Sequence, residues 1–236
     1  MRECLGVALA VLILAAAAGA QSGAGGHARA AIERGNEAAA RGQYELALTA
    51  YREALSAQGE LRALAHYNVG VCHYHAGRPR EAADAYREAI RLRRGRYPKA
   101  SYALGVAYGE LGDWRAARDA FEVVLKLSED EDAEAAFDLG VALTQLGENE
   151  AAAARFRQAI ALNTQSLAPG HNNLGVALAR AGRLGEAERE FDTALRLAGG
   201  AFDDARDNLR LCRSLMGASG RGLAANWRIV RAAKAG

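Results

Sequence analysis

The sequence predicts an all-α protein, a solenoid of five tandem helix–turn–helix repeats with a capping helix at its C-terminal end. Three observations support this fold class. The 236-residue chain is rich in alanine and has only three prolines, and such a composition favours helix over sheet. Glycine recurs every 35 residues, and a second glycine follows each one by seven residues. Alanine and aromatic residues then recur at fixed distances behind each glycine pair.

The repeat consists of six columns that agree across five units, and it is the strongest signal in the sequence. A period of this length is typical of repeat architectures, in which each unit packs on its neighbours. The first and second glycines are Gly35, Gly70, Gly105, Gly140 and Gly175, and Gly42, Gly77, Gly112, Gly147 and Gly182. The columns behind them are Ala47, Ala82, Ala117, Ala152 and Ala187; Tyr51, Tyr86, Phe121, Phe156 and Phe191; Ala54, Ala89, Val124, Ala159 and Ala194; and Leu55, Ile90, Leu125, Ile160 and Leu195.

These columns predict two helices in each unit. The first glycine lies inside a helical pattern, where it costs about 1 kcal/mol relative to alanine. Its presence in every unit indicates that a neighbouring helix approaches too closely for a Cβ atom. The second glycine follows the last periodic residue and suits the left-handed position after a helix C-terminus. Alanine, an aromatic residue and alanine or valine then lie on one face of a second helix. Each unit is therefore predicted as helix A, a tight turn and helix B.

This pattern resembles the tetratricopeptide repeat (TPR), which has a small residue at its eighth place, glycine near its fifteenth, alanine at its twentieth and an aromatic residue at its twenty-fourth. The resemblance implies a right-handed α-solenoid over residues 28–202. Here the period is 35 rather than 34, with the extra residue in each connection from helix B to helix A, and the family's late proline and early tryptophan are missing. The repeats are predicted at 28–62, 63–97, 98–132, 133–167 and 168–202.

The N-terminal residues are predicted to be a targeting segment. Residues 1–20 have a basic residue near the start, an apolar run and small residues at the exit, as a secretory signal peptide does. We therefore expect the protein to be exported, periplasmic or secreted, and of a bacterial-envelope type. An uncleaved anchor is the alternative, although the run is shorter than the roughly 20 residues of a membrane span. Residues 21–27 are predicted as a flexible leader.

The C-terminal residues are predicted as a cap followed by a tail. Residues 203–216 continue the register as one more helix A, which would cover the last apolar face. Residues 217–236 are predicted as a basic flexible tail, because they contain four basic and no acidic residues in a chain of net charge +2. Leu223, Trp227 and Val230 have helical spacing, so one hypothesis is a basic amphipathic helix that contacts an anionic surface or a partner. A frayed tail that folds back on the cap is the other, because twelve residues are marginal for an isolated helix.

The resemblance implies that helix A of each unit lines a concave groove. Contiguous exposed apolar side chains usually mark a binding site, and tyrosine combines a large area with a polar tip. The alternative is that a tighter superhelix or the N-terminal leader covers these side chains. The residues predicted to line a peptide-binding groove are Ile32, Asn36, Tyr67, Val71, Tyr74, Lys99, Tyr102, Val106, Phe137, Val141 and Val176.

Asn36, Asn68 and Lys99 also match three places with which some TPR co-chaperones grip the C-terminal carboxylate of heat-shock chaperones. Ile32 and Ala103 replace two of the three cations in that pattern, which removes most of the charge-assisted bonding to a carboxylate. The alternative is that the two asparagines bond the helix backbones of adjacent repeats.

No catalytic, metal or cofactor site is predicted. Nucleophile-elbow, P-loop and dinucleotide-binding motifs do not occur in the sequence. The histidines lack the three or four convergent ligands of a zinc site and are predicted to be packing residues. Cys72 and Cys212 lie four units apart, too far for a disulfide in a solenoid, so they are predicted to be half-buried packing residues.

We therefore expect a non-catalytic scaffold or adaptor that binds a protein or peptide segment in the groove of its repeats. A nucleic-acid partner is not expected, and membrane contact is expected only through the tail. The alternative is a structural or assembly subunit of an envelope complex that acts through self-association or its basic tail. The sequence leaves the partner and the oligomeric state open.

Overall fold

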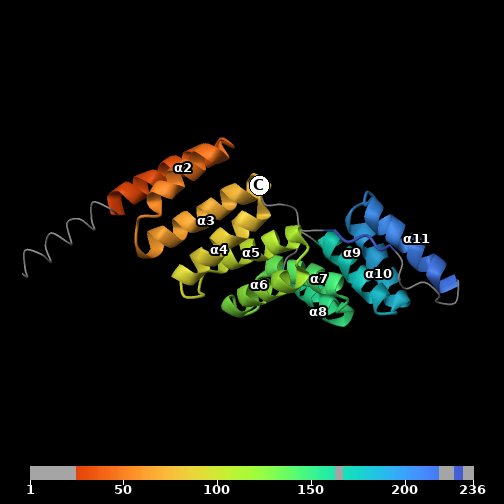
Figure 1. Cartoon of the computed structure of the whole chain (residues 1–236). Coiled ribbons are helices and arrows are strands. Elements are labelled where there is room, and N and C mark those ends of the chain that lie inside the picture. The colour runs from red at the N-terminus through yellow and green to blue at the C-terminus, as the bar shows by residue number, and fades with distance from the viewer. Residues whose placement is uncertain (1–24, 163–166, 218–225, 231–236) are drawn as a thin grey trace, which may run out of the picture. The chain divides into compact units, whose positions relative to one another are not determined.

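The computed structural model describes residues 25–162, 167–217 and 226–230, and every regular element in these ranges is an α-helix (Figure 1). The chain forms two parts, one up to Ala107 and one from Tyr108, which we describe separately. The predicted signal peptide lies outside the described residues. The predicted leader is wrong at its end, because residues 25–27 already belong to the first helix. Within the described ranges, none of the helices is both long and apolar enough to span a membrane.

The first part begins with a helix that occupies residues 25–40. The helices α2 (Tyr44–Ala54), α3 (Gly59–His75) and α4 (Pro79–Leu92) follow, and the first ten residues of α5 (Pro98–Leu111) complete this part. Helix α3 packs against both α2 and α4. The chain therefore forms consecutive helix pairs at the positions that the repeat predicts.

Over its described residues, the second part contains the end of α5 and six further helices. Each helix packs against the next, from α6 to α11, and the A-type helices α7 and α9, and α9 and α11, also touch. Such nearest-neighbour packing is characteristic of a solenoid. The helices are α6 (Trp114–Leu127), α7 (Ala133–Leu146), α8 (Asn149–Leu162), α9 (Leu167–Arg180), α10 (Leu184–Leu197) and α11 (Asp203–Gly217), the last over almost the residues predicted for the cap.

The first glycine of the repeat makes room for the aromatic ring of helix B, which confirms the predicted close approach. A Cβ atom at Gly140 would lie 2.7 Å from Cε1 of Phe156, and one at Gly175 would lie 2.6 Å from Cε1 of Phe191. Both distances are shorter than any real Cβ contact. Gly35 and Gly70 stand in the same relation to Tyr51 and Tyr86. The two columns are therefore one packing unit: a missing side chain on helix A and a ring on helix B.

The second glycine ends helix A in the predicted left-handed conformation. Gly147 is the C-cap of α7, with a φ of 80°. The equivalent residues have φ values between 71° and 83° and are Gly42, Gly77, Gly112 and Gly182. Behind them, the alanine column is fully buried at Ala47, Ala82, Ala117, Ala152 and Ala187.

A second left-handed turn occurs in the connection from helix B to helix A. Gly59, Arg94, Glu129 and Gly199 lie at the same place of the repeat and all have a φ between 53° and 61°. After α4, the backbone N–H of Gly95 donates to the carbonyl of Ile90, a bond that closes helix C-termini of this kind. This turn lies where the sequence places the residue that lengthens the period from 34 to 35.

Candidate functional site

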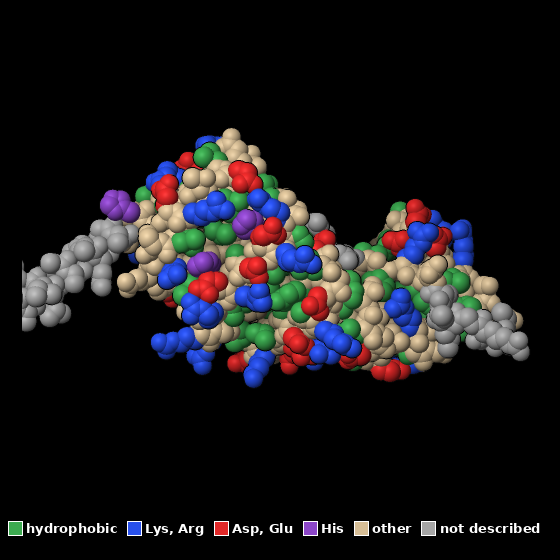
Figure 2. Space-filling view, viewed as in Figure 1, with side chains coloured by type: hydrophobic (Ala, Val, Ile, Leu, Met, Phe, Trp, Pro, Cys, Tyr) green, Lys and Arg blue, Asp and Glu red, His purple; other side chains and the backbone are tan. Residues whose placement is uncertain are grey.

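The first part contains most of the predicted groove residues, and they form a half-buried surface. Helix α3 carries Tyr67, Val71 and Tyr74, and α5 carries Tyr102 and Val106, all of intermediate exposure. The side chains of Asn36 and Lys99 are exposed at this surface. We call these residues, together with Asn68, the tyrosine surface. In Figure 2, hydrophobic side chains reach the exterior of this part among acidic and basic ones.

Tyr67 lies at the centre of an aromatic cluster. The centroid of the Tyr67 ring is 5.7 Å from that of Tyr86 and 5.6 Å from that of Tyr97. The Nζ atom of Lys99 lies 5.3 Å from the centroid of the Tyr67 ring. Burial raises the pKa of Tyr67 to about 12, so its hydroxyl stays protonated and can donate a hydrogen bond at neutral pH. A half-buried ring with a cation above it can bind apolar and acidic groups of a polypeptide.

The two asparagines of this surface bond each other. Oδ1 of Asn36 accepts hydrogen bonds from the hydroxyl of Tyr51 at 2.8 Å and from Nδ2 of Asn68 at 3.3 Å. The bonds therefore link side chains from three helices, rather than reaching the helix backbones as one alternative expected. The result is a pair of amide groups that hold each other in place.

The predicted groove is wrong at four residues. Ile32, Phe137, Val141 and Val176 are buried, with exposed fractions of 5%, 7%, 4% and 0%. The ring of Phe137 packs edge-on against Phe156, with centroids 5.6 Å apart. It thereby adds to the interior packing of the repeat instead of forming an open wall.

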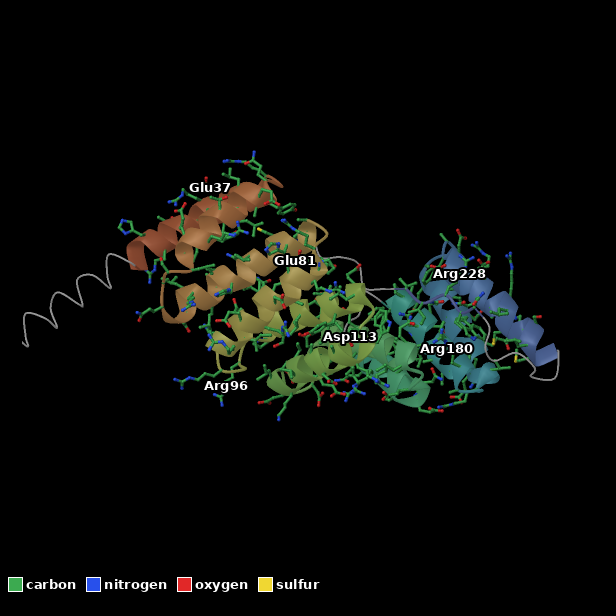
Figure 3. The ribbon with its side chains drawn as sticks, in the orientation of Figure 1. Glu37, Glu81, Arg96, Asp113, Arg180 and Arg228 are labelled. Atoms are coloured by element: carbon green, nitrogen blue, oxygen red, sulfur yellow. The ribbon has the colours of Figure 1, made fainter. Side chains whose placement is uncertain are left out.

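Two contacts in the second part involve α9 and lie outside the repeat pattern. The first is the side chain of Arg180, which donates from Nη1 to the carbonyl of Thr144 at 2.9 Å (Figure 3). Burial lowers the pKa of this guanidinium group. The second is the chain's own segment 226–230, which lies against α9 and α11. The repeat pattern alone predicts neither of these contacts.

The segment 226–230 has no helical turn, and one of its side chains is deeply buried. The ring of Trp227 is 6% exposed and stacks on Phe191, with centroids 5.9 Å apart and planes 14° apart. Phe191 is the ring that fills the space left by Gly175. The tail therefore folds back on the last helices, as one of the two hypotheses expected, and the amphipathic-helix hypothesis is wrong for these five residues.

Asparagine side chains hold the main chain of this segment. Asn208 accepts from the N–H of Arg228 and donates to its carbonyl, both at 2.9 Å. Asn173 accepts from the N–H of Val230 at 2.9 Å and donates to its carbonyl at 2.6 Å. Asn172 donates to the carbonyl of Arg228 at 3.1 Å. The backbone N–H and C=O groups of Arg228 and Val230 thus point to the same side of an extended chain, as those of alternate residues in a β-strand do.

Two acidic side chains hold the basic residue of the segment. Nη1 of Arg228 lies 3.3 Å from Asp204, and its Nη2 lies 3.0 Å from Asp207, both on α11 (Figure 3). We call the site formed by Asn172, Asn173, Phe191, Asp204, Asp207 and Asn208 the tail groove. It combines main-chain hydrogen bonds with one aromatic and one charged contact.

The comparisons with known proteins agree with this architecture. A family model described as tetratricopeptide repeat matches residues 32–100 and 102–166, and a second model of the same description matches residues 168–201. The chain belongs to the tetratricopeptide repeat family. A comparison with curated proteins found no significant match.

Solved TPR structures share the fold of this TPR protein. MamA from Desulfovibrio magneticus RS-1 is 20% identical, with a TM-score of 0.67 over 74% of this chain and 97% of that one. YrrB, described as a TPR protein with an unusual peptide-binding site, is 24% identical, with a TM-score of 0.63 over 79% and 90%. A TPR protein from Parabacteroides merdae is 20% identical, with a TM-score of 0.69 over 84% and 77%. At these identities the likeness shows the fold.

Sequence reasoning missed the tail groove, although a signal for it exists. Asn173 and Asn208 are 35 residues apart and occupy the sixth place of their TPR units, the place that Asn68 holds in the second unit. A repeated asparagine at a place that faces the groove is thus visible in the sequence. The segment that the asparagines bind lies outside the repeat and has no such signal.

His171, Cys72 and Cys212 lie in structural environments. Nδ1 of His171 lies 2.6 Å from a carboxylate oxygen of Glu190. Cys72 and Cys212 are buried, and burial raises the pKa of both thiols to about 11, so they are protonated at neutral pH. Over the described ranges, no group of three or more potential ligands could hold a metal ion.

Proposed function

We propose that this TPR protein is a non-catalytic scaffold that binds a segment of another polypeptide at the tyrosine surface. The cluster around Tyr67 is the observation that carries this proposal. Its ring is half-buried and lies below the ammonium group of Lys99. The hydrogen-bonded pair of Asn36 and Asn68 adds polar groups to the same part of the chain. An aromatic anchor surrounded by polar groups is the usual anatomy of a protein-binding site. The description of YrrB as a peptide-binding TPR protein supports the same type of function.

The proposal is tested with peptides selected from a random displayed library against the purified protein. Lys99→Ala and Asn68→Ala are the informative variants, because truncation of Tyr67 would also disturb its packing on Tyr86. We expect each variant to weaken the selected peptides about tenfold, the loss of one hydrogen bond or cation contact. Lys126→Ala is the matched control, because Lys126 is an exposed lysine of α6, in the other part of the chain. If Lys99→Ala and Lys126→Ala bind the peptides equally, the tyrosine surface is not the site.

The proposal includes export of the protein to the periplasm or beyond the cell. Its support is the pattern of residues 1–20, with a basic residue near the start, an apolar run and the small-residue exit Ala18-Gly19-Ala20. In a secreting bacterial host, mass spectrometry should find Gln21 at the N-terminus of the recovered protein. Ile13→Arg, which interrupts the apolar run, should leave the full-length chain in the cytosol. Recovery of the unsubstituted chain with Met1 intact in the cytosol would contradict export.

A further inference from the structure

The tail groove holds its segment in the way that a binding site holds a peptide. Five hydrogen bonds join the main chain of Arg228 and Val230 to asparagine side chains. Such bonds recognise an extended backbone and place no restriction on the side chain of the residue between the two bonded ones. Because Nδ2 of Asn208 also donates to Oδ1 of Asn172 at 2.9 Å, the amides hold each other in the bonding orientation.

Two contacts add a preference for particular side chains. The flat face of Phe191 receives the ring of Trp227, and the carboxylates of Asp204 and Asp207 receive the guanidinium of Arg228. The indole N–H of Trp227 is buried, with no hydrogen-bond partner among the described residues. The position that the Trp227 ring occupies therefore requires a flat apolar ring and makes no use of a hydrogen-bond donor, so phenylalanine fits this position as well as tryptophan.

Only one residue of the segment, Trp227, reaches the hydrophobic core of the repeats. Helices α9, α10 and α11 pack directly against one another. Of the five residues, only Trp227 is buried, whereas Asn226 and Arg228 are exposed and the other two are of intermediate exposure. One buried aromatic anchor, with polar and charged contacts around it, is the pattern of a peptide in a groove.

We propose that the tail groove is a second peptide-binding site, separate from the tyrosine surface, and that residues 226–230 are its intramolecular ligand. Its external ligands are extended polypeptide segments with an aromatic residue followed by a basic one. A tethered ligand has an effective concentration that reaches the millimolar range for a short linker. An external segment must therefore displace the tail, and the tail weakens the apparent affinity for every competitor.

Displacement can be followed in the full chain by fluorescence. The sequence has two tryptophans, so Trp114→Phe leaves Trp227 as the only tryptophan, and its emission is excited selectively at the red edge of the absorption band. The probe is a synthetic peptide with the sequence of residues 222–236 in which phenylalanine replaces the tryptophan. We expect saturable peptide binding to shift the emission to longer wavelength and to increase acrylamide quenching, while the helical circular dichroism stays constant. Two results would overturn the proposal: an emission that stays unchanged at millimolar peptide, or an emission that shifts only when helical circular dichroism is lost. Either result would show that the segment is a permanent part of the folded structure.

A second experiment measures the competition itself. Arg228→Glu places a carboxylate opposite Asp204 and Asp207 and should release the tail. A fluorescently labelled peptide of the natural sequence should then bind at least about tenfold more tightly than to the unsubstituted chain, because its tethered competitor is lost. Arg157→Glu, on the exposed face of α8, is the matched charge control and should bind as the unsubstituted chain does.

Two outcomes of this experiment would overturn the proposal. Adding Asn173→Ala to the Arg228→Glu chain should abolish peptide binding, since Asn173 makes both bonds to Val230; binding that survives lies outside the groove. Sedimentation at increasing protein concentration tests where the tail binds. Dimers that dissociate when the peptide is added would show that the tail occupies a second copy, against the intramolecular assignment. Neither experiment involves the tyrosine surface, so the proposed function stands or falls separately.

Discussion

At Gly140 the absence of a side chain sets the distance between two helices. The ring of Phe156 is fully buried and occupies the space where a Cβ atom would lie. Alanine is the better helix former by about 1 kcal/mol. The clash between an added Cβ atom at residue 140 and the ring of Phe156 opposes this preference. The size of this clash decides whether alanine at residue 140 stabilises or destabilises the protein.

We expect Gly140→Ala to lower the free energy of unfolding by about 1–3 kcal/mol, the usual cost of overpacking a well-packed core. Urea denaturation measures the change, with the slope of the transition unchanged. Gly185→Ala is the control, because Gly185 is exposed in the first turn of α10 and no atom lies within 4 Å of its added Cβ. Equal stability of Gly140→Ala and the unsubstituted protein would mean that the ring moves aside without cost.

His66 couples stability to pH. Its pKa is lowered from 6.5, chiefly because burial disfavours the charged imidazolium; Arg62 and Arg91 add to this effect and Glu88 opposes it. The unfolded chain therefore binds a proton more readily than the folded one. Folding stability is greatest above the unfolded pKa of about 6.5 and falls as the pH drops through that value.

We expect the urea midpoint to decrease between pH 7.5 and pH 5, and His66→Phe to reduce this decrease. Phenylalanine suits the site because the family has a tryptophan at this place of the repeat. His73, whose pKa is also lowered mainly by burial, contributes the remainder. His27→Asn, which removes an exposed histidine of the first helix, is the control variant. The same pH dependence in His66→Phe and the unsubstituted protein would remove His66 as its cause.

At the scale of the element, the left-handed turn after helix B has different residues in different units. Gly59 and Gly199 adopt it without steric strain, whereas Arg94 adopts a φ of 54° with a Cβ atom. A left-handed conformation costs an ordinary L-residue about 1–2 kcal/mol. Glycine recovers this cost in the folded state but loses about 0.5–1 kcal/mol through the entropy of the unfolded chain.

The reciprocal exchange tests this turn. Arg94→Gly should raise the free energy of unfolding by about 0.5–1 kcal/mol, the difference between the two effects. Gly199→Arg should lower it by a similar amount, because no atom lies within 4 Å of the added Cβ and only backbone strain changes. Thermal and urea unfolding measure both. Two changes of the same sign would show that side-chain contacts, rather than φ, govern the turn.

The helices could be predicted from the sequence because their causes repeat every 35 residues. The pairing of Gly175 with Phe191, the buried alanine column and the left-handed Gly147 each follow from residue types at fixed distances. The start of the first helix could not be placed, since residues 25–27 begin with two glycines, which are typical of a leader. Their helical conformation depends on the helix that follows them.

At the scale of the whole molecule, repeat packing makes stability a sum over neighbours. In the second part, α9 packs against α8 and α10 and touches α7 and α11. We expect Gly175→Ala, which forces α9 away from the ring of Phe191, to reduce amide protection in a graded way. Hydrogen exchange measured by mass spectrometry should show the largest loss in α9 and α10, a smaller one in α8 and α11, and the least in α6. A uniform loss from α6 to α11 would instead indicate one cooperative unit.

The candidate sites could be predicted only in part, for a reason that belongs to this scale. The repeat assigns each side chain a place within its unit, and in the first part Tyr67 and Asn68 lie at the surface that this place implies. The repeat does not specify which segments outside it pack against those side chains. Asn173 and Val230 are 57 residues apart, and Val230 lies outside the 35-residue repeat. For Val176 the repeat place predicts exposure in a groove, but the side chain is fully buried.

The division of labour within the tail groove has an evolutionary consequence. The asparagines hold main-chain atoms, so residue 229 can change identity without loosening the grip on Arg228 and Val230. Selectivity resides in Phe191 and the carboxylates of α11. Substitutions at those few positions would change the sequence motif that the site binds, while the hydrogen bonds from the asparagine side chains would preserve its affinity. How tightly the site binds and what it recognises can therefore diverge independently among descendants of this chain.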